Sequence, residues 1–189
     1  MTYRDINIKK FAPILADQFI GYKATLDSLR DFQTFIDSKK EALGELFKYL
    51  NNQMSDFEII SASLNDNILD IEINDTSYWI SKDEISSDID LYNEVFPFHL
   101  IYKNVHEYSV NEVLNDGTIL NNHDFDIIGA EIMCDQLIDF DESKIVLGLK
   151  LWKYTDSLSK NALLIISADS FDVIDNQTDK YLEIKKDCL

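Results

Sequence analysis

The spacing of hydrophobic residues changes once along the chain, near residue 55. Before this point apolar residues recur every three or four positions, which is the period of an amphipathic helix. After it they mostly alternate with polar residues, as in a strand with one solvated face. The pattern therefore predicts a helical part over residues 1–54 and a mainly β part over residues 55–189.

Two apolar stripes define the helices expected in the first part. Their members are Tyr22, Leu26, Leu29, Phe32 and Ile36 in the first stripe, and Leu43, Leu46, Phe47 and Leu50 in the second. Ser38-Lys39-Lys40-Glu41 has the spacing of a capping box, so we expect a helix to begin there. Residues 4–20 are also expected to be helical, with Pro13 near one end.

The clearest strand signal is the alternation of Leu69, Ile71 and Ile73 with Asp70 and Glu72. Asn65-Asp66-Asn67 lies just before it, and Asn and Asp tolerate the positive φ angles of tight turns. We therefore expect a hairpin whose first strand covers residues 57–64.

Further strand patterns continue to the end of the chain. Residues 128–135 and 147–152 alternate, whereas residues 162–168 are continuously apolar, as in a strand buried on both faces. Asn115-Asp116-Gly117 indicates a turn of the hairpin kind. Residues 78–80, 98–108 and 181–184 are also expected to be strands.

The order of the elements, helices first and strands afterwards, favours an α+β fold. We predict N-terminal amphipathic helices packed on one face of a mainly antiparallel β-sheet. The chain has 189 residues and no Pro/Gly-rich linker, so we expect a single domain, 1–189, with a helical part (1–54) and a mainly β part (55–189).

Acidic residues are concentrated in the middle of the chain. Residues 56–142 contain 21 Asp and Glu against only Lys82 and Lys103, a net charge of −19, and the segments on either side are close to neutral. The chain is 46% hydrophobic, which is too much for a disordered acidic tail. We therefore expect a folded protein whose surface repels nucleic acids and anionic membranes and attracts basic proteins.

The sequence also favours a cytoplasmic location. The start of the chain lacks the pattern of a signal peptide, and no stretch approaches the roughly 18 apolar residues that span a bilayer. Cys134 and Cys188 are the only cysteines, and we expect both to be reduced thiols.

Several patterns are compatible with catalysis, but each has a simpler interpretation. Two acidic clusters offer oxygen ligands for a hard cation, yet neither has the register of a calcium-binding loop, and solvated loops are the simpler interpretation. The clusters are Asn122, His123, Asp124 and Asp126, and Asp135, Asp139, Asp141 and Glu142. Glu183-Ile184-Lys185, with Asp169, Asp172 or Asp175 upstream, has the end of an acid…acid-x-Lys nuclease motif, but it also fits a polar strand.

The remaining residue types restrict the chemistry further. His99, His106 and His123 stand beside no cysteine and in no nucleophile elbow, so we expect partly exposed structural histidines. The spacing of His99 and His106 places them on opposite faces of a regular strand. The five glycines are scattered, which argues against a phosphate-binding loop.

We therefore predict an interaction protein rather than an enzyme, with no catalytic residue, metal or cofactor. An acidic inhibitor that neutralises a basic, nuclease-like partner, as bacterial immunity proteins do, fits the charge and size. Asp70, Glu72, Glu131 and Asp135 are expected on the binding face, because their neighbours in the alternating pattern point into the core. The alternatives are a metal-dependent hydrolase built on the acidic clusters, a nucleic-acid-mimicking inhibitor and an assembly subunit.

Overall fold

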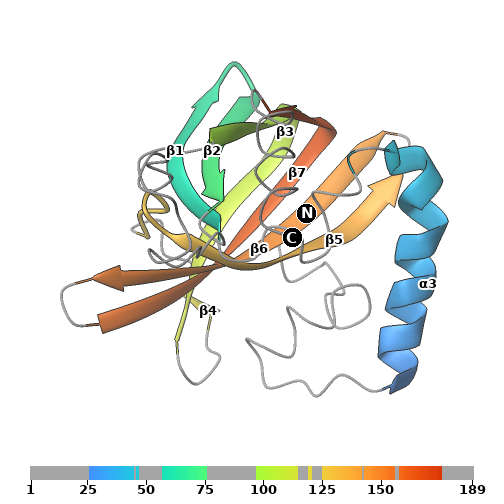
Figure 1. The fold of residues 1–189 in the computed structure, drawn as a ribbon, viewed down its shortest axis with the longest axis horizontal. Helices are drawn as coiled ribbons and strands as arrows, with labels where there is room; N and C mark the ends of the chain where they lie inside the picture. Colours follow the sequence, from blue (N-terminus) through green and yellow to red (C-terminus); the bar gives the residue numbers. More distant parts are fainter. Residues whose placement is uncertain are drawn as a thin grey trace, which may run out of the picture.

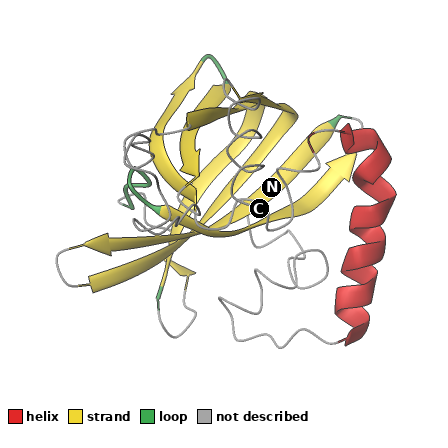
Figure 2. Cartoon of the chain, in the orientation of Figure 1, coloured by secondary structure: helices red, strands yellow, loops and turns green. Residues whose placement is uncertain are grey.

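A computed structural model gives the fold of this chain and describes residues 26–44, 46, 57–75, 97–114, 119–120, 125–141, 143–155 and 158–175. Its elements are α3 (Leu26–Leu43), β1 (Phe57–Asn65), β2 (Ile68–Asp75), β3 (Pro97–Val113), β4 (Ile119–Leu120), β5 (Glu131–Asp141), β6 (Lys144–Thr155) and β7 (Leu158–Asp175). Figure 1 shows the strands as one curved sheet with α3 at its side. The described part of the chain is therefore mainly β, as Figure 2 makes plain.

The sheet closes on itself. Its strand order is β2-β1-β5-β6-β7-β3-β4, every pairing is antiparallel, and β2 also pairs with β3. Six strands thus form a closed ring, and β4 is added to the end of β3. The prediction of a mainly antiparallel sheet is confirmed, whereas its closure was not predicted.

The first hairpin follows directly from its turn residues. Asp66 and Asn67 have φ angles of 49° and 63°, and Asn65 and Ile68 are partners across the turn. Two successive residues with positive φ match the twist of a two-residue hairpin loop, and Asp and Asn accept that conformation more readily than other non-glycine residues. The predicted hairpin is confirmed.

The interior of the ring is filled by apolar side chains from every strand. Residues 162–168 of β7 are buried without exception, which confirms the prediction of a strand covered on both faces. On β2 the alternation also holds, because Leu69, Ile71 and Ile73 are at most 1% exposed. Bulges interrupt the register of β1, β3 and β5 and add curvature to these strands.

The expectation of several helices packed on a sheet face is wrong for the described residues, which contain one helix. α3 stands at the end of the β5–β6 hairpin rather than across a face (Figure 1). Phe32, Ile36 and Leu43 join the same hydrophobic core as the strands, and Lys39 Nζ lies 6.0 Å from the centre of the Phe140 ring on β5. The helix expected over residues 4–20, and residues 47–50 of the helix expected to begin at Ser38, lie outside the described residues.

The predicted helix start at Ser38 is also wrong. Ser38 lies inside α3, where its Oγ donates a hydrogen bond to the carbonyl oxygen of Phe35 at 2.6 Å. A serine hydroxyl can bond the preceding turn instead of a helix end, so the capping pattern does not mark a boundary here. α3 ends at Leu43 because Gly44 adopts a φ of +54°, a left-handed conformation that favours glycine at a helix end.

The closed interior predicts where apolar truncation is costly. Leu149 on β6 is fully buried between Asp135 on β5 and Leu164 on β7, whereas Leu158 at the tip of the β6–β7 hairpin is 69% exposed. Leu149→Ala should lower the free energy of unfolding by about 2–5 kcal/mol. Leu158→Ala should change it by less than about 0.5 kcal/mol. Urea denaturation of both variants checks this, and equal losses would contradict the described interior.

Candidate functional site

Three of the four predicted binding residues lie on the outer side of neighbouring strands. Asp70 and Glu72 are on β2 beside the inward-facing Ile71 and Ile73, and Glu131 is on β5 beside the inward-facing Ile132. β1 separates β2 from β5 in the sheet order. The outward side chains of β1 therefore decide whether the acids of β2 and β5 form one continuous surface.

β1 contributes Glu58, a residue that the sequence analysis did not single out. Glu58 is the direct cross-strand partner of Glu131, so their side chains stand side by side on the outer surface. Its place between Phe57 and Ile59 marked it as an outward position of a strand. Only the pairing of β1 with β5, which local pattern does not reveal, brings it next to Glu131. We call Glu58, Asp70, Glu72 and Glu131 the acidic face.

Members of the acidic face differ in their polar contacts. Asp70 Oδ1 lies 2.8 Å from His99 Nδ1, and Glu72 Oε2 accepts a hydrogen bond from Ser61 Oγ at 2.9 Å. Glu58 and Glu131 form no ion pair with any lysine or arginine among the described residues. Two carboxylates directly opposite each other repel, so this pair costs the folded protein free energy.

The fourth predicted residue, Asp135, does not belong to this face. It is 0% exposed, and its direct partner on β6 is the inward-facing Leu149. The register of β5 shifts between Ile132 and Cys134, where Met133 is the extra residue of a bulge. One extra residue reverses the faces of the positions that follow, here as far as the next register shift, between Leu137 and Asp139. Strict alternation put Asp135 outside, and the bulge puts it inside.

Asp135 shares the interior with a fully buried tyrosine. Burial, together with the negative charge of Asp135, raises the pKa of Tyr102 far above its usual value, so the hydroxyl stays protonated. The Tyr102 ring lies 4.9 Å from that of Phe171, centre to centre. Its hydroxyl has no hydrogen-bond partner among the described residues.

The predicted metal and nuclease patterns do not converge where they are described. Asp135 lies inside the ring, whereas Asp141 is exposed and accepts hydrogen bonds from the backbone N–H and hydroxyl of Ser143. Among the described side chains, no three His, Cys, Asp or Glu residues are placed to hold one metal ion. Residues 122–124, Glu142 and the Glu183-Ile184-Lys185 segment lie outside the described residues.

The upstream acids of the nuclease pattern pair with β3 instead. Asp172 accepts a hydrogen bond from Lys103 Nζ at 2.6 Å. Asp169 contacts His106 Nε2 and accepts a hydrogen bond from Asn104 Nδ2 at 3.0 Å. These pairs join β3 to β7 on the surface.

The two described histidines are both partly exposed, which confirms that part of the prediction. The side chain of His99 is 31% exposed and that of His106 is 55% exposed, each beside a carboxylate. The expectation of opposite faces assumed a regular strand, but β3 is irregular between the two histidines, where Asn104 has a φ of 53° and the register shifts between Val105 and Glu107. His123 lies outside the described residues.

Comparison with known proteins finds no match among family models, curated proteins or solved structures. Within the described residues, no helix is long and apolar enough to cross a membrane.

The unsatisfied hydroxyl of Tyr102 gives a test of the interior. Tyr102→Phe removes a buried polar group that has no partner, so the free energy of unfolding should stay the same or rise by up to about 1–2 kcal/mol. Tyr154→Phe is the control. Tyr154 is 66% exposed, so the loss of its hydroxyl should have little effect on stability. A loss above about 1 kcal/mol in Tyr102→Phe alone, measured by urea denaturation, would show that the hydroxyl is hydrogen-bonded.

The ion pair between Asp126 and Lys153 predicts a pH dependence. The hydrogen bond from Lys153 Nζ, at 2.9 Å, and that from the Ile128 N–H, at 3.0 Å, lower the pKa of Asp126. A carboxyl whose pKa is lower in the folded state stabilises the protein above its unfolded pKa, about 3.9, and this contribution is lost as the pH falls through the folded value. Asp126→Asn should therefore be less stable than the parent at pH 7, and the difference should disappear in strong acid.

Urea denaturation at pH 7, and at the lowest pH at which the protein is still folded, measures this difference in the free energy of unfolding. The effect should stay below about 1 kcal/mol because the Asp126 side chain is 67% exposed. Lys153→Gln should lose more than Asp126→Asn, because Lys153 Nζ also donates to the carbonyl oxygens of Asp126 and Ile128. The double variant should lose less than the sum of the two single losses. Additive losses would mean that the two side chains do not interact.

Proposed function

We propose that this protein binds a basic protein partner through the acidic face and acts as an inhibitor of the immunity type. The observation that supports this proposal is the direct pairing of Glu58 with Glu131, without a neutralising lysine or arginine among the described residues. A partner that places a cation between the two carboxylates relieves their repulsion on binding. The repulsion between Glu58 and Glu131 is therefore weaker in such a complex than in the protein alone.

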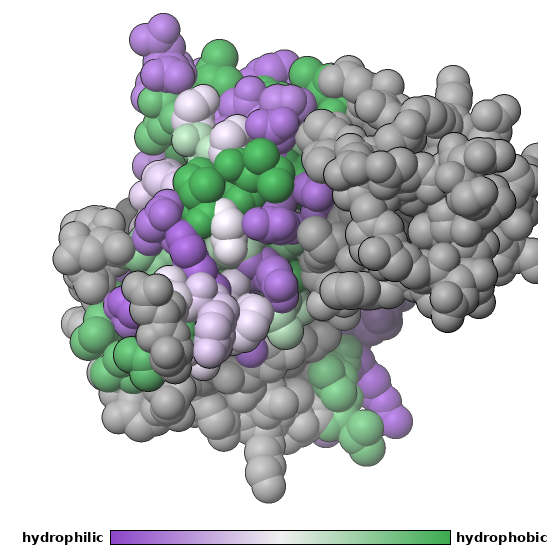
Figure 3. Space-filling view, turned by 60° about the vertical axis from the view of Figure 1, so that its left-hand side comes forward, coloured by the Kyte–Doolittle hydropathy of each residue, from purple (hydrophilic) through white to green (hydrophobic). Residues whose placement is uncertain are grey.

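The charge of the whole chain supports the same partner type. A formal charge of −18 attracts basic proteins over a distance and accelerates their association. Figure 3 shows hydrophilic and hydrophobic side chains side by side on one face of the described part of the protein. A mixture of this kind suits a polar, electrostatically steered contact, because the rim of an interface is usually polar.

The alternatives receive less support from the described residues. A metal-dependent hydrolase requires several carboxylates at one point, whereas Asp135 is buried and Asp141 is exposed and bonded to Ser143. A nucleic-acid-mimicking inhibitor is a close variant of the proposal, since it uses the same acids against a DNA-binding partner. Competition by duplex DNA for the bound partner separates that variant from other inhibitors.

The proposal includes a cytoplasmic location. Cys134 is buried, and burial raises the pKa of its thiol to about 11. A protonated, buried thiol is a poor nucleophile, so a structural role fits Cys134 better than a catalytic one.

The test removes the charges of the central pair and measures two properties. Glu58→Gln combined with Glu131→Gln should slow association with the basic partner recovered from lysate and flatten the dependence of its affinity on salt. The same double variant should be more stable than the parent, by a few tenths to about 1 kcal/mol, because the like-charge repulsion is gone. Weaker binding together with higher stability cannot come from unfolding.

The matched control removes two exposed charges from α3. Asp27→Asn combined with Asp31→Asn makes the same change in total charge but leaves the acidic face intact. It should leave the affinity close to that of the parent. Equal losses from both double variants, or losses only from the control, would place the binding surface elsewhere on the chain.

A further inference from the structure

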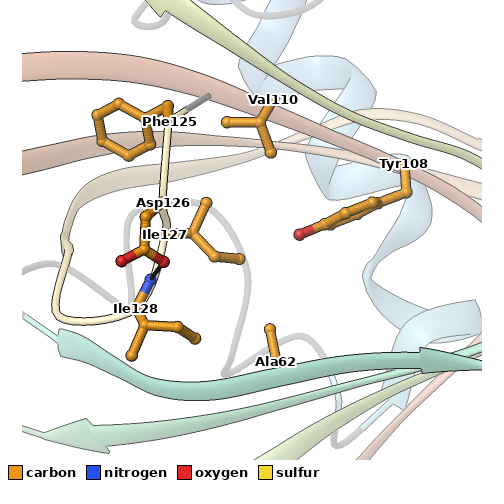
Figure 4. Close-up of a pocket in the computed structure, with 7 residues that line it drawn as sticks. All are labelled: Ala62, Tyr108, Val110, Phe125, Asp126, Ile127 and Ile128. Atoms are coloured by element: carbon orange, nitrogen blue, oxygen red, sulfur yellow. Dashed lines mark hydrogen bonds between the residues drawn. The ribbon is translucent and has the colours of Figure 1, made fainter. Parts of the chain in front are cut away.

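A pocket opens between β1, β3 and the segment that leads into β5. Its volume is about 300 Å³, and its lining residues are Ala62, Tyr108, Val110, Phe125, Asp126, Ile127 and Ile128. β3 pairs with β2 only as far as Lys103, opposite Ile68, and then continues along β7. Past Lys103, β3 keeps one hydrogen bond to the turn of the β1–β2 hairpin, from the Val105 N–H to the carbonyl oxygen of Asn67 at 2.9 Å. Residues 125–128 line the space between β1 and the following part of β3 (Figure 4).

The wall of the pocket is about half apolar and half polar, although most of its lining side chains are aliphatic or aromatic. Phe125 and Ile127 belong to the hydrophobic core, and Ala62 and Val110 pack against it. Ala62 is the smallest of these side chains, so β1 leaves room at this point. The apolar half of the wall thus favours contact with a hydrocarbon or aromatic surface, and the polar half offers hydrogen-bonding groups beside it.

The polar side chains that line the pocket are Tyr108 and Asp126. The hydroxyl of Tyr108 is directed from β3 towards Ile127 across the pocket (Figure 4). Burial raises the pKa of Tyr108, so the hydroxyl stays neutral and both donates and accepts hydrogen bonds. It is suited to fix the orientation of a molecule that is otherwise apolar.

The mouth of the pocket is held in place by Lys153 on β6. Lys153 Nζ donates to Asp126 Oδ2 at 2.9 Å, to the carbonyl oxygen of Asp126 at 3.1 Å and to the carbonyl oxygen of Ile128. Asp126 Oδ1 also accepts from the Ile128 N–H at 3.0 Å. The two opposite charges neutralise each other and fix the segment that carries Phe125 and Ile127.

We propose that this pocket binds a small neutral molecule with an apolar body about the size of one ring and a single hydrogen-bonding group. The volume lies at the lower end of the range for ligand sites, which restricts the body to that size. The ion pair at the mouth favours neither a cation nor an anion, and the total charge of −18 opposes anions. The hydrogen-bonding group meets the hydroxyl of Tyr108.

The test compares three probes that share one ring: p-cresol, toluene and 4-methylbenzoate. Titration followed by amide NMR should give saturable shifts at residues 125–128 with p-cresol and weaker binding of toluene. The ratio of the two affinities should be about threefold to tenfold, the size expected for one neutral hydrogen bond. 4-Methylbenzoate should bind least. No saturable shift with p-cresol at millimolar concentration, or equal binding of p-cresol and the benzoate, would overturn the proposal.

Variants then locate the binding site. Tyr108→Phe should reduce the affinity for p-cresol to that for toluene and leave toluene unchanged. Ala62→Leu should fill the pocket and abolish the binding of both probes. Ser63→Leu, at the exposed neighbouring position on β1, is the matched control and should leave both affinities intact.

A second filling variant protects this test against misfolding. Val110→Phe fills the same space from β3. The NMR spectrum shows whether each filling variant is folded, and the test needs only one of the two to fold. Persistence of p-cresol binding in a folded filling variant would show that the probe occupies another place. Since no charge of the acidic face is altered, this outcome is independent of the test for a basic partner.

Discussion

The structure depends on the double pairing of β2. This strand pairs with β1 through the hairpin at Asp66-Asn67 and with β3 on its other side. The two pairings close the sheet into a ring with an interior and an outer surface. Without that second pairing, the interior side chains of β2 and β3 would face solvent at two open edges. Burial of the apolar set from Ile59 to Phe171 in one cluster therefore requires closure. The acidic face and the pocket both take their positions from the same closure.

The local sequence pattern predicts the elements better than their arrangement. Turn chemistry at Asn65-Asp66-Asn67, the alternation of β2 and the apolar run of β7 are local signals, and each matches the structure. The ring is different, because the pairing of β2 with β3 joins residues about thirty positions apart. No local pattern specifies that contact. The same holds for the pairing of Glu58 with Glu131, which completes the acidic face.

The other differences between the predicted and the observed structure lie in strand register and helix boundaries. A bulge at Met133 carries no distinctive residue type, yet it moves Asp135 from the expected outer surface into the interior. Ser38 shows the corresponding problem in α3, since a hydroxyl can bond the preceding turn as well as a helix end. In both cases the local sequence is compatible with two conformations, and contacts with residues distant in sequence decide between them.

The join between β1 and β5 has a consequence for the behaviour of the protein at high concentration. It rests on two partner pairs, Phe57 with Ile132 and Glu58 with Glu131, and on two backbone hydrogen bonds of Ile59 with Gly129 and Ala130. So short a pairing opens more readily than the long β3–β7 pairing, and opening exposes two strand edges. Each edge then carries a glutamate. Edges of two opened molecules repel each other, which discourages the strand exchange and fibril growth that exposed edges otherwise promote.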